Sequence, residues 1–234
     1  MRFEVLATDY DGTIAHDGRV SANVIDAFLR LRRMERKLVL VTGRELDDLM
    51  RACCYLDVFD LIVAENGALL YSPRPPTEFP LALPPPASFV AKLRARGVAP
   101  LSCGRIVVAT WQPHEQTVLE VIREEGLELE MIFNKGAIMI LPSGINKGTG
   151  LCAALAELHV GAGSVVGVGD AENDHSLLGA CAFGVAVANA VSSLKNRADL
   201  VTAAPRGEGV IELCERLLNG NLPCVEKMSP LFWG

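Results

Sequence analysis

The sequence predicts an α/β protein in which a parallel-sheet core is interrupted by a small α+β domain. Three observations support this prediction. Short, wholly apolar runs such as Leu38–Val41 and Leu61–Ala64 are typical of strands covered on both faces. These runs alternate with helical patterns, which is the order that produces parallel strands with right-handed crossovers. Between residues 83 and 142 the alternation stops, and it resumes afterwards, as expected for an insert.

The first core segment, residues 1–82, is predicted to begin with a buried strand over Phe3–Thr8 that leads into an acidic run. Ser21 is a suitable N-cap for the helix that follows. A second helix is expected over about Glu45–Cys54, between the two apolar strands. Seven prolines in the segment Pro73–Pro86 favour a stiff connector, because proline lacks the N–H that the interior of a helix or strand needs.

The insert, residues 83–142, is predicted to form a small domain that we term the cap. The expected helices and strands of the cap are Ala87–Arg96, Arg105–Trp111, His114–Glu125, Leu127–Phe133 and Ala137–Leu141, in the order helix, strand, helix, strand, strand. Asn134-Lys135-Gly136 between the last two strands is typical of a hairpin turn.

The second core segment, residues 143–234, restores the alternation of strands and helices. Its expected elements are two helices and three strands, over Lys147–His159, Gly209–Leu217, Ser164–Val168, Phe183–Val187 and Asp199–Val201. No element is assigned to the last dozen residues.

Composition and charge narrow the class of protein. The net charge of -6 and the lack of a block of Lys and Arg argue against a nucleic-acid partner. No apolar run reaches the ~18–20 residues that a membrane span needs, so no membrane association is expected. The seven cysteines show no metal-ligand spacing and the first residues do not resemble a secretory leader, which favours a cytoplasmic enzyme. Nothing in the sequence indicates an oligomeric state.

Polar residues follow several of the predicted strands, at the edge where open α/β sheets bind their ligands. Asp9 and Asp11 come two residues apart after the first strand, and Gly12 permits a sharp exit there. Two carboxylates this close repel each other, so a divalent cation, a shared proton or both must hold them. Asp170 and Asp174 follow a later strand and, with Asp9, supply the hard oxygen ligands that Mg²⁺ prefers.

Partners for a phosphate are also expected at this edge. Thr42 offers a hydroxyl at a strand end, and Gly43 and the amides after it open a helix whose N-terminus favours anions. Lys147 begins another helix, where its ammonium can neutralise a carboxylate and a phosphoryl group. Asn173 is placed to orient a water or a phosphate oxygen. Each of these residues alone has an ordinary structural explanation, but their occurrence together predicts phosphoryl transfer.

These motifs resemble those of the haloacid dehalogenase-like hydrolase superfamily over nearly the whole chain. The four matching motifs are Asp9-Tyr10-Asp11-Gly12-Thr13, Thr42 after an apolar strand, Lys147, and Gly169-Asp170-Ala171-Glu172-Asn173-Asp174. The position of the insert is similar to that of the type-2 caps of the Cof-type sugar-phosphatase branch. Val41-Thr42-Gly43-Arg44, Glu65-Asn66-Gly67-Ala68 and Asn189-Ala190 also resemble that branch, whereas His175 and Ala188 depart from it.

The resemblance implies a Rossmann-like core and a Mg²⁺-dependent phosphatase that hydrolyses a small phosphorylated metabolite of the sugar-phosphate or phosphoglycolate type. Asp9 would form an aspartyl-phosphate, and Asp11 would protonate the leaving oxygen and later deprotonate the attacking water. Mg²⁺ would be held by Asp9, the backbone carbonyl of Asp11 and Asp170, with Asp174 in support.

Substrate contacts are expected from both domains. Arg44 and Asn66 follow core strands that lead into the site, so together with Gly43 and Asn173 they are the predicted substrate-binding residues. In the cap, the polar or aromatic candidates are Arg105, Trp111, His114 and Lys135.

Two alternatives remain open at this point, and the sequence argues against a third. A phosphomutase of the phosphomannomutase type would use the same aspartyl-phosphate but return the phosphoryl group to a reoriented sugar. The chain is also compatible with a catalytic or binding domain of a longer protein. A phospho-accepting receiver module shares the aspartate, Mg²⁺ and lysine, but the sixty-residue insert argues against that class.

Overall fold

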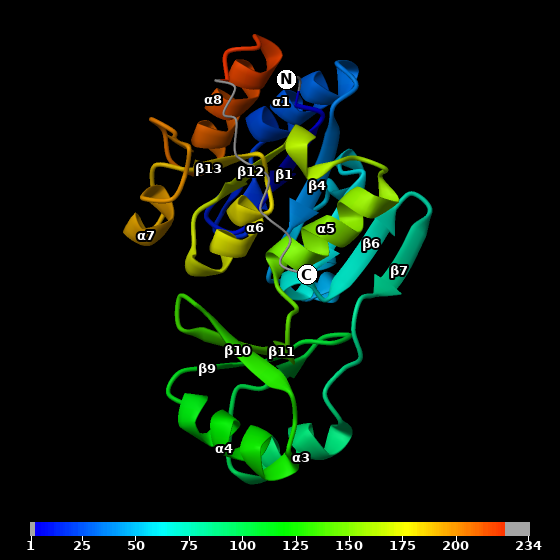
Figure 1. The fold of residues 1–234 in the computed structure, drawn as a ribbon, viewed down its shortest axis with the longest axis vertical. Coiled ribbons are helices and arrows are strands. Elements are labelled where there is room, and N and C mark those ends of the chain that lie inside the picture. The colour runs from blue at the N-terminus through cyan, green and yellow to red at the C-terminus, as the bar shows by residue number, and fades with distance from the viewer. Residues whose placement is uncertain (1–2, 223–234) are drawn as a thin grey trace, which may run out of the picture.

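The computed structural model describes residues 3–222; residues 1–2 and 223–234, at the ends of the two predicted core segments, lie outside the described residues. An eight-stranded sheet forms the core, in the order β14-β13-β12-β1-β4-β5-β6-β7 (Figure 1). The strands from β14 to β5 pair in parallel, and β6 and β7 extend the sheet antiparallel. These strands are β1 (Val5–Thr8), β4 (Lys37–Val41), β5 (Leu61–Ala64), β6 (Leu69–Pro73), β7 (Pro76–Pro80), β12 (Val165–Gly169), β13 (Phe183–Ala186) and β14 (Leu200–Val201).

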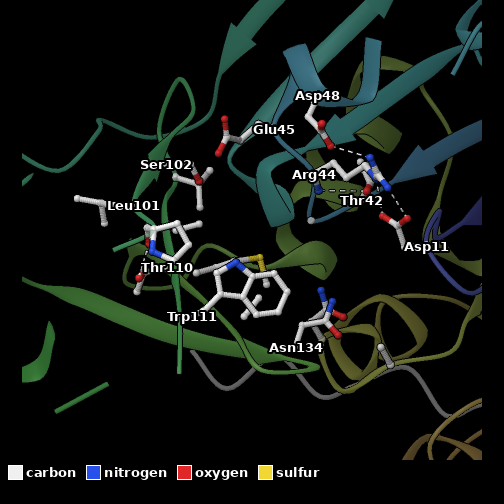
Figure 2. Close-up of a pocket in the computed structure, with 18 of the residues that line it drawn as sticks. Asp11, Thr42, Arg44, Glu45, Asp48, Leu101, Ser102, Thr110, Trp111 and Asn134 are labelled. Carbon is white, nitrogen blue, oxygen red and sulfur yellow. Dashed lines mark hydrogen bonds and ion pairs between the residues drawn. The ribbon is translucent and has the colours of Figure 1, made fainter. Parts of the chain in front are cut away.

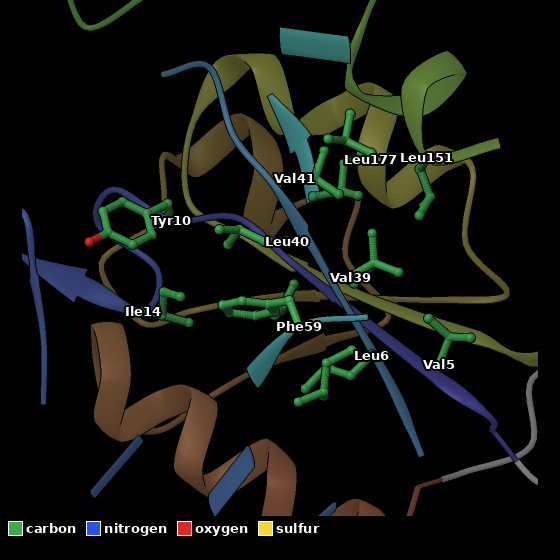
Figure 3. Close-up of a cluster of buried hydrophobic side chains, with 14 of the residues drawn as sticks. Val5, Leu6, Tyr10, Ile14, Val39, Leu40, Val41, Phe59, Leu151 and Leu177 are labelled. Carbon is green, nitrogen blue, oxygen red and sulfur yellow. The ribbon is translucent and has the colours of Figure 1, made fainter. Parts of the chain in front are cut away.

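Helices cover both faces of this sheet. α1 and α8 pack together on one face, and α5 and α6 lie on the other (Figures 1 and 3). The helices of the core are α1 (Ala22–Arg33), α2 (Leu46–Ala52), α5 (Lys147–Glu157), α6 (His175–Gly179), α7 (Ser192–Lys195) and α8 (Arg206–Leu218). Short 3-10 turns η1 to η4 occur at Leu56–Val58, Glu65–Gly67, Ala162–Ser164 and Glu172–Asp174. As predicted, the Ser21 hydroxyl caps α1 by accepting from the N–H of Val24.

The apolar strands explain why the sheet sits in the middle of the core. All four residues of β1 are buried, as are the last four of β4. Val39 and Val41 point toward Leu151 of α5 and Leu177 of α6 (Figure 3). Alternate residues face the other layer, and burying each such side chain stabilises the fold by about 1.5–3 kcal/mol. Because β1, β4, β5 and β12 pair in parallel, their carboxyl ends lie side by side at one edge of the sheet.

The cap forms a second layered unit below this edge (Figure 1). Its antiparallel sheet has the order β10-β11-β9-β8 and faces the core, with α3 and α4 on the far side. The elements are α3 (Ala87–Ala95), β8 (Ser102–Cys103), β9 (Val108–Trp111), α4 (Glu115–Glu125), β10 (Leu129–Asn134) and β11 (Ala137–Pro142). Lys135 and Gly136 form the two-residue turn of the predicted hairpin, both with positive φ. All these elements lie between residues 83 and 142.

Several details differ from the sequence-based expectation. The proline-rich segment is not simply a connector, because β7 runs from Pro76 to Pro80 as the outer strand of the sheet. An edge strand tolerates proline, since N–H groups on its outer side have no ladder partner to lose. The predicted cap strand Arg105–Trp111 is shorter than expected, because β9 begins at Val108. A small hairpin, β2 (Ala15–His16) and β3 (Arg19–Val20), and strand β6 were not predicted.

The described part of the chain has no helix with the length and apolarity needed to cross a membrane. The cysteines at positions 53, 54, 103, 152 and 214 of this part are free thiols.

Gly150 of α5 allows a close helix–strand contact that supports the catalytic edge. A Cβ at this position would lie 2.5 Å from Cγ1 of Val63 and 2.6 Å from the Cα of Gly67. Glycine to alanine normally stabilises a helix, but here we expect G150A to destabilise the protein by about 1–3 kcal/mol because of overpacking. Urea unfolding measures this difference. G161A is the matched control, since a Cβ at Gly161 meets nothing within 4 Å, and an equal effect of both variants would contradict the packing argument.

Candidate active site

Asp9 lies at the carboxyl end of β1, the central strand of the site. It is buried, and its N–H donates to the carbonyl of Val168 on the neighbouring β12 at 3.0 Å. Oδ2 of Asp9 accepts from the hydroxyl of Thr13 at 2.9 Å. Gly12 has φ +85°, and a Cβ there would lie 2.4 Å from Oδ2 of Asp170. Glycine is therefore required by both the backbone conformation and the close approach of the two acidic strand ends.

Lys147 connects the acidic residues electrostatically. Its side chain is only 1% exposed, and Nζ lies 2.6 Å from Oδ1 of Asp9 and 2.6 Å from Oδ1 of Asp174. The residue opens α5, whose start is fixed by a capping box between Asn146 and Thr149. This capping box orients the first turn of α5, so that Lys147 points into the site rather than into solvent.

Asp174 has a mainly organising position. Its Oδ2 accepts from the N–H groups of Asp170 and Ala171, both at 2.9 Å, while its other oxygen accepts from Lys147. These bonds hold the turn after β12 and aim the Asp170 carboxylate toward Asp9. Both carboxylate oxygens of Asp174 therefore already have donors within the protein.

The acidic cluster fits a divalent cation. One carboxylate oxygen from each of Asp9, Asp170 and Asp174 lies within 4.8 Å of the other two, and all three residues are buried. Lys147 offsets only part of this negative charge. Hard carboxylate oxygens in excess over the available positive charge are the donor set that Mg²⁺ prefers.

The titration properties of the cluster agree with an excess of buried negative charge. Burial and the charge of Asp174 raise the pKa of Asp9 to about 7, although Lys147 opposes the shift. Burial also raises the pKa of Asp170, and Lys135 partly counteracts this effect. Burial alone would lower the pKa of Lys147, but the charges of Asp174 and Asp9 raise it above its ordinary value. Lys147 is therefore a permanent cation in this site.

Asp11, the predicted acid and base, is held by Arg44 (Figure 2). Nε and Nη2 of Arg44 donate to the two carboxylate oxygens of Asp11 at 2.6 and 2.7 Å. Nη1 of the same guanidinium donates to Asp48 at 2.6 Å, and the Arg44 side chain lies over the ring of Tyr10. Asp11 is nearly half exposed, so it borders the pocket beside the buried cluster rather than joining it.

The predicted phosphate and substrate residues surround the same strand ends. Thr42 is buried directly after β4, and its hydroxyl accepts from the N–H of Arg44 at 3.2 Å. Asn173 donates through Nδ2 to Oδ1 of Asn66 at 2.9 Å. Nδ2 of Asn66 and Oδ1 of Asn173 are buried without a partner among the described residues. An unsatisfied amide next to the carboxylates is suited to binding oxygens of a ligand.

A cavity of ≈ 620 Å³ lies between the core and the cap. Asp9, Asp11, Thr42, Gly43, Arg44 and Asn173 line its core side. The cap side is uncharged and includes Leu101, Ser102, Thr110, Trp111 and Asn134 (Figure 2). The cavity thus places reactive groups on one wall and a mixed apolar and polar surface on the other.

The four cap candidates have different positions. Trp111 lines the cavity, and Nζ of Lys135, at the tip of the β10–β11 hairpin, lies 2.9 Å from Oδ2 of Asp170. Arg105 instead pairs with Asp47 and Glu78 of the core, and the ring of His114 bonds to the carbonyl of Ala99. Neither of these two is among the residues that line the cavity.

Two contacts were missed as site features by sequence reasoning. The hydroxyl of Thr13 bonds to Asp9 and lies 3.4 Å from Oδ1 of Asp170. The signal that could have found it is its place at the end of the acidic run. Nδ2 of Asn189 donates to the carbonyl of Gly12 at 2.9 Å and braces the same turn. Only its resemblance to the Asn-Ala motif had drawn attention to Asn189.

Curated relatives cover almost the whole chain. Phosphoglycolate phosphatase 2 of Saccharolobus solfataricus is 30% identical over 226 residues, covering 93% of each chain. A phosphoglycolate phosphatase of Pyrobaculum neutrophilum is 31% identical over 228 residues, covering 94% of this chain and 98% of the relative.

Solved structures share the fold at lower identity. A haloacid dehalogenase-like hydrolase from Bacteroides thetaiotaomicron superposes with a TM-score of 0.75 at 19% identity, over 92% of this chain and all of that chain. A sugar phosphatase described as HAD subclass IIB gives 0.76 at 19% identity, over 94% of this chain and all of that chain. The family model described as haloacid dehalogenase-like hydrolase matches residues 6–77 and 106–213, more than half of the chain. The chain belongs to the haloacid dehalogenase-like hydrolase family.

Proposed function

We propose that this protein is a Mg²⁺-dependent phosphatase that hydrolyses a small phosphorylated metabolite through an aspartyl-phosphate on Asp9. The observation that carries the proposal is the Lys147 ammonium, 2.6 Å from both Asp9 and Asp174 at the edge where Asp170 and Thr42 also meet. A nucleophile, a buried cation, a metal-binding carboxylate set and hydroxyl and amide donors are what phosphoryl transfer requires. The curated relatives named phosphoglycolate phosphatase support the same activity.

Each residue has a defined part in the proposed reaction. An oxygen of Asp9 attacks phosphorus, and the phosphoryl group forms a bond to that oxygen while the bond to the leaving oxygen breaks. Lys147 and the Thr42 hydroxyl bind the charged oxygens and orient the phosphoryl group. Asp9, Asp170 and the backbone carbonyl of Asp11 would hold Mg²⁺, which would add positive charge near the phosphoryl oxygens.

Asp11 carries the proton in this proposal. It donates a proton to the leaving oxygen and then accepts one from the water that hydrolyses the aspartyl-phosphate. Its carboxylate is close enough to the pocket for this, but it must give up its bidentate pair with Arg44. Arg44 is then free to contact the leaving group from the core side.

The substrate is proposed to be of the sugar-phosphate or phosphoglycolate type. The cavity is large enough for a molecule of about a few hundred Å³. The names of the curated relatives and of the subclass IIB neighbour refer to phosphoglycolate and to sugar phosphates, which are small molecules of this kind. Free thiols in the described residues favour a reducing, cytoplasmic location. A screen of purified protein against a panel of phosphorylated metabolites identifies the preferred leaving group.

Replacing the nucleophile tests the mechanism directly. D9N keeps the shape of the side chain but removes the anionic oxygen, so Mg²⁺-dependent release of phosphate from p-nitrophenyl phosphate should fall by at least about 10⁴-fold. D26N, on the exposed face of α1, should stay within about twofold of the wild type. Full activity of D9N would rule out the aspartyl-phosphate route.

If Asp11 is the acid and base, D11N should release p-nitrophenolate in a single burst. p-Nitrophenolate leaves without protonation, so D11N should release about one equivalent per enzyme and then stall, because no base activates the water. With an alkyl phosphate, D11N should show no burst, since that leaving group needs the proton. Stopped-flow absorbance and the mass of the intact protein measure both results. Steady turnover by D11N at the wild-type rate would refute the assignment.

Metal binding can be tested by protein stability, without an assay of phosphatase activity. Mg²⁺ at about 100 times its Kd should raise the free energy of unfolding by about 2.7 kcal/mol. D170N removes one charged ligand, so it should weaken or abolish this stabilisation, whereas D26N should retain it. Urea unfolding with and without Mg²⁺ gives the comparison, and an unchanged stabilisation of D170N would exclude Asp170 as a ligand.

A further inference from the structure

Glu65 is a buried carboxylate to which the proposed chemistry assigns no role. It follows β5, is fully buried, and receives three backbone hydrogen bonds from the cap. Oε1 accepts from the N–H of Arg105 at 2.7 Å, and Oε2 accepts from those of Ile106 and Val107 at 2.7 and 2.9 Å. A core carboxylate thus binds three consecutive amides that lie about forty residues further along the chain.

The turn that carries Glu65 has an unusual backbone. Glu65, Asn66 and Gly67 have φ of +52°, +56° and +110°. For non-glycine residues this conformation costs of order 1 kcal/mol or more each, and it persists only where the surroundings impose it. Burying a carboxylate adds a desolvation cost, which the three charge-assisted hydrogen bonds offset. Strain and buried charge concentrated at one contact between domains indicate a function beyond local folding.

The same turn is bonded to the catalytic edge on its other side. The N–H of Glu65 donates to the carbonyl of Arg44, and the N–H of Asn66 donates to the carbonyl of Thr42, both at 2.9 Å. Gly67 packs closely on Asn146, the residue before Lys147. A Cβ on Gly67 would lie 2.0 Å from the carbonyl oxygen of Asn146. The position of the Glu65 carboxylate is therefore fixed relative to the phosphate-binding residues.

The cap residues held by Glu65 lead directly into the cavity wall. Val107 itself lines the cavity, and the strand that follows it, β9, contributes Thr110 and Trp111 to the same wall. Ile106 and Val107 also pack with Ala68, the residue after the turn, in a small apolar cluster. The three hydrogen bonds and this cluster set where the wall lies above Asp9.

Gly104 shows how close the fit is. A Cβ at this position would lie 2.5 Å from Oε1 and 2.6 Å from Cδ of Glu65. Unlike the end of a long exposed side chain, this carboxylate cannot move away without breaking the bonds to residues 105–107. Gly104 and Glu65 are consequently a coupled pair.

We propose that Glu65 is a positioning residue for the reaction: its carboxylate fixes the β9 wall of the cap over the nucleophile, and through it the site of the leaving group. The proposal rests on the phosphatase function given above. Glu65 touches neither the reacting atoms nor the phosphate, so its loss should affect leaving-group binding while leaving the core phosphate site in place.

The test compares E65A and E65Q with the wild type. For p-nitrophenyl phosphate we expect KM to rise in E65A, and kcat/KM to fall by about 10- to 100-fold, because displacements of about 1 Å have effects of this size. E65Q should be intermediate, since its amide keeps acceptor oxygen for some of the N–H groups but presents an NH₂ to another. The inhibition constant of inorganic phosphate, which needs only the core site, should stay within about twofold.

A double-mutant comparison and amide exchange test the contact itself. G104A should impair hydrolysis in the wild-type background but add little in E65A, because the truncated side chain leaves room for the new methyl group. Hydrogen exchange of residues 105–107 should accelerate in E65A, since their N–H groups lose their acceptor. G161A is the control glycine and should change neither quantity.

The proposal would be overturned if E65A had the kinetics of the wild type, or if inhibition by inorganic phosphate weakened as much as kcat/KM fell. It would also be overturned if G104A had the same effect in the wild-type and E65A backgrounds. A wild-type protein without phosphatase activity would overturn the proposed function and with it the part of Glu65 in catalysis. Since amide exchange does not depend on turnover, it distinguishes that result from failure of the contact.

Discussion

The buried ion pairs of Lys147 are the interaction on which the catalytic edge depends. One ammonium lies between Asp9 and Asp174, and the bonds of Asp174 to the backbone then fix Asp170. Removing one partner of a buried pair commonly costs about 3–5 kcal/mol, because the remaining charge is left uncompensated. Lys147 at the start of α5 therefore joins Asp9, which follows β1, to Asp174, which lies after β12. It does so where phosphate chemistry needs positive charge.

In the proposed reaction the cap has a separate part, which is to form the leaving-group side of the cavity above the phosphate site of the core. Its sheet faces the core, and its cavity wall carries Trp111 but no charge, so chemistry and substrate shape are assigned to different domains. Glu65 connects the two, because its turn is bonded to the Thr42 loop on one side and to residues 105–107 of the cap on the other. The geometry of the wall is thereby tied to the geometry of the nucleophile.

Sequence patterns were sufficient for the inner strands of the core sheet and for placing the motif residues directly after them. Apolar runs such as Leu38–Val41 can be buried only as inner strands, and the residues that follow them must then gather at one edge. The strand over the prolines at 76 and 80 was missed because edge position, which makes proline tolerable, depends on the neighbouring strand β6. The start of β9 was misplaced because the N–H groups of residues 105–107 bond to Glu65 instead of to a strand.

The sequence by itself determined the α/β core, the insert and the family motifs at the strand ends, since these depend on local periodicity and on residue types. Only the tertiary structure decided how these groups are paired. It places Asp11 against Arg44, Lys135 against Asp170 and Arg105 against core carboxylates, and it bonds Glu65 to the backbone of the cap. Such pairings depend on long-range contacts between charged groups, and Coulomb attraction and hydrogen bonding leave no periodic trace in the chain.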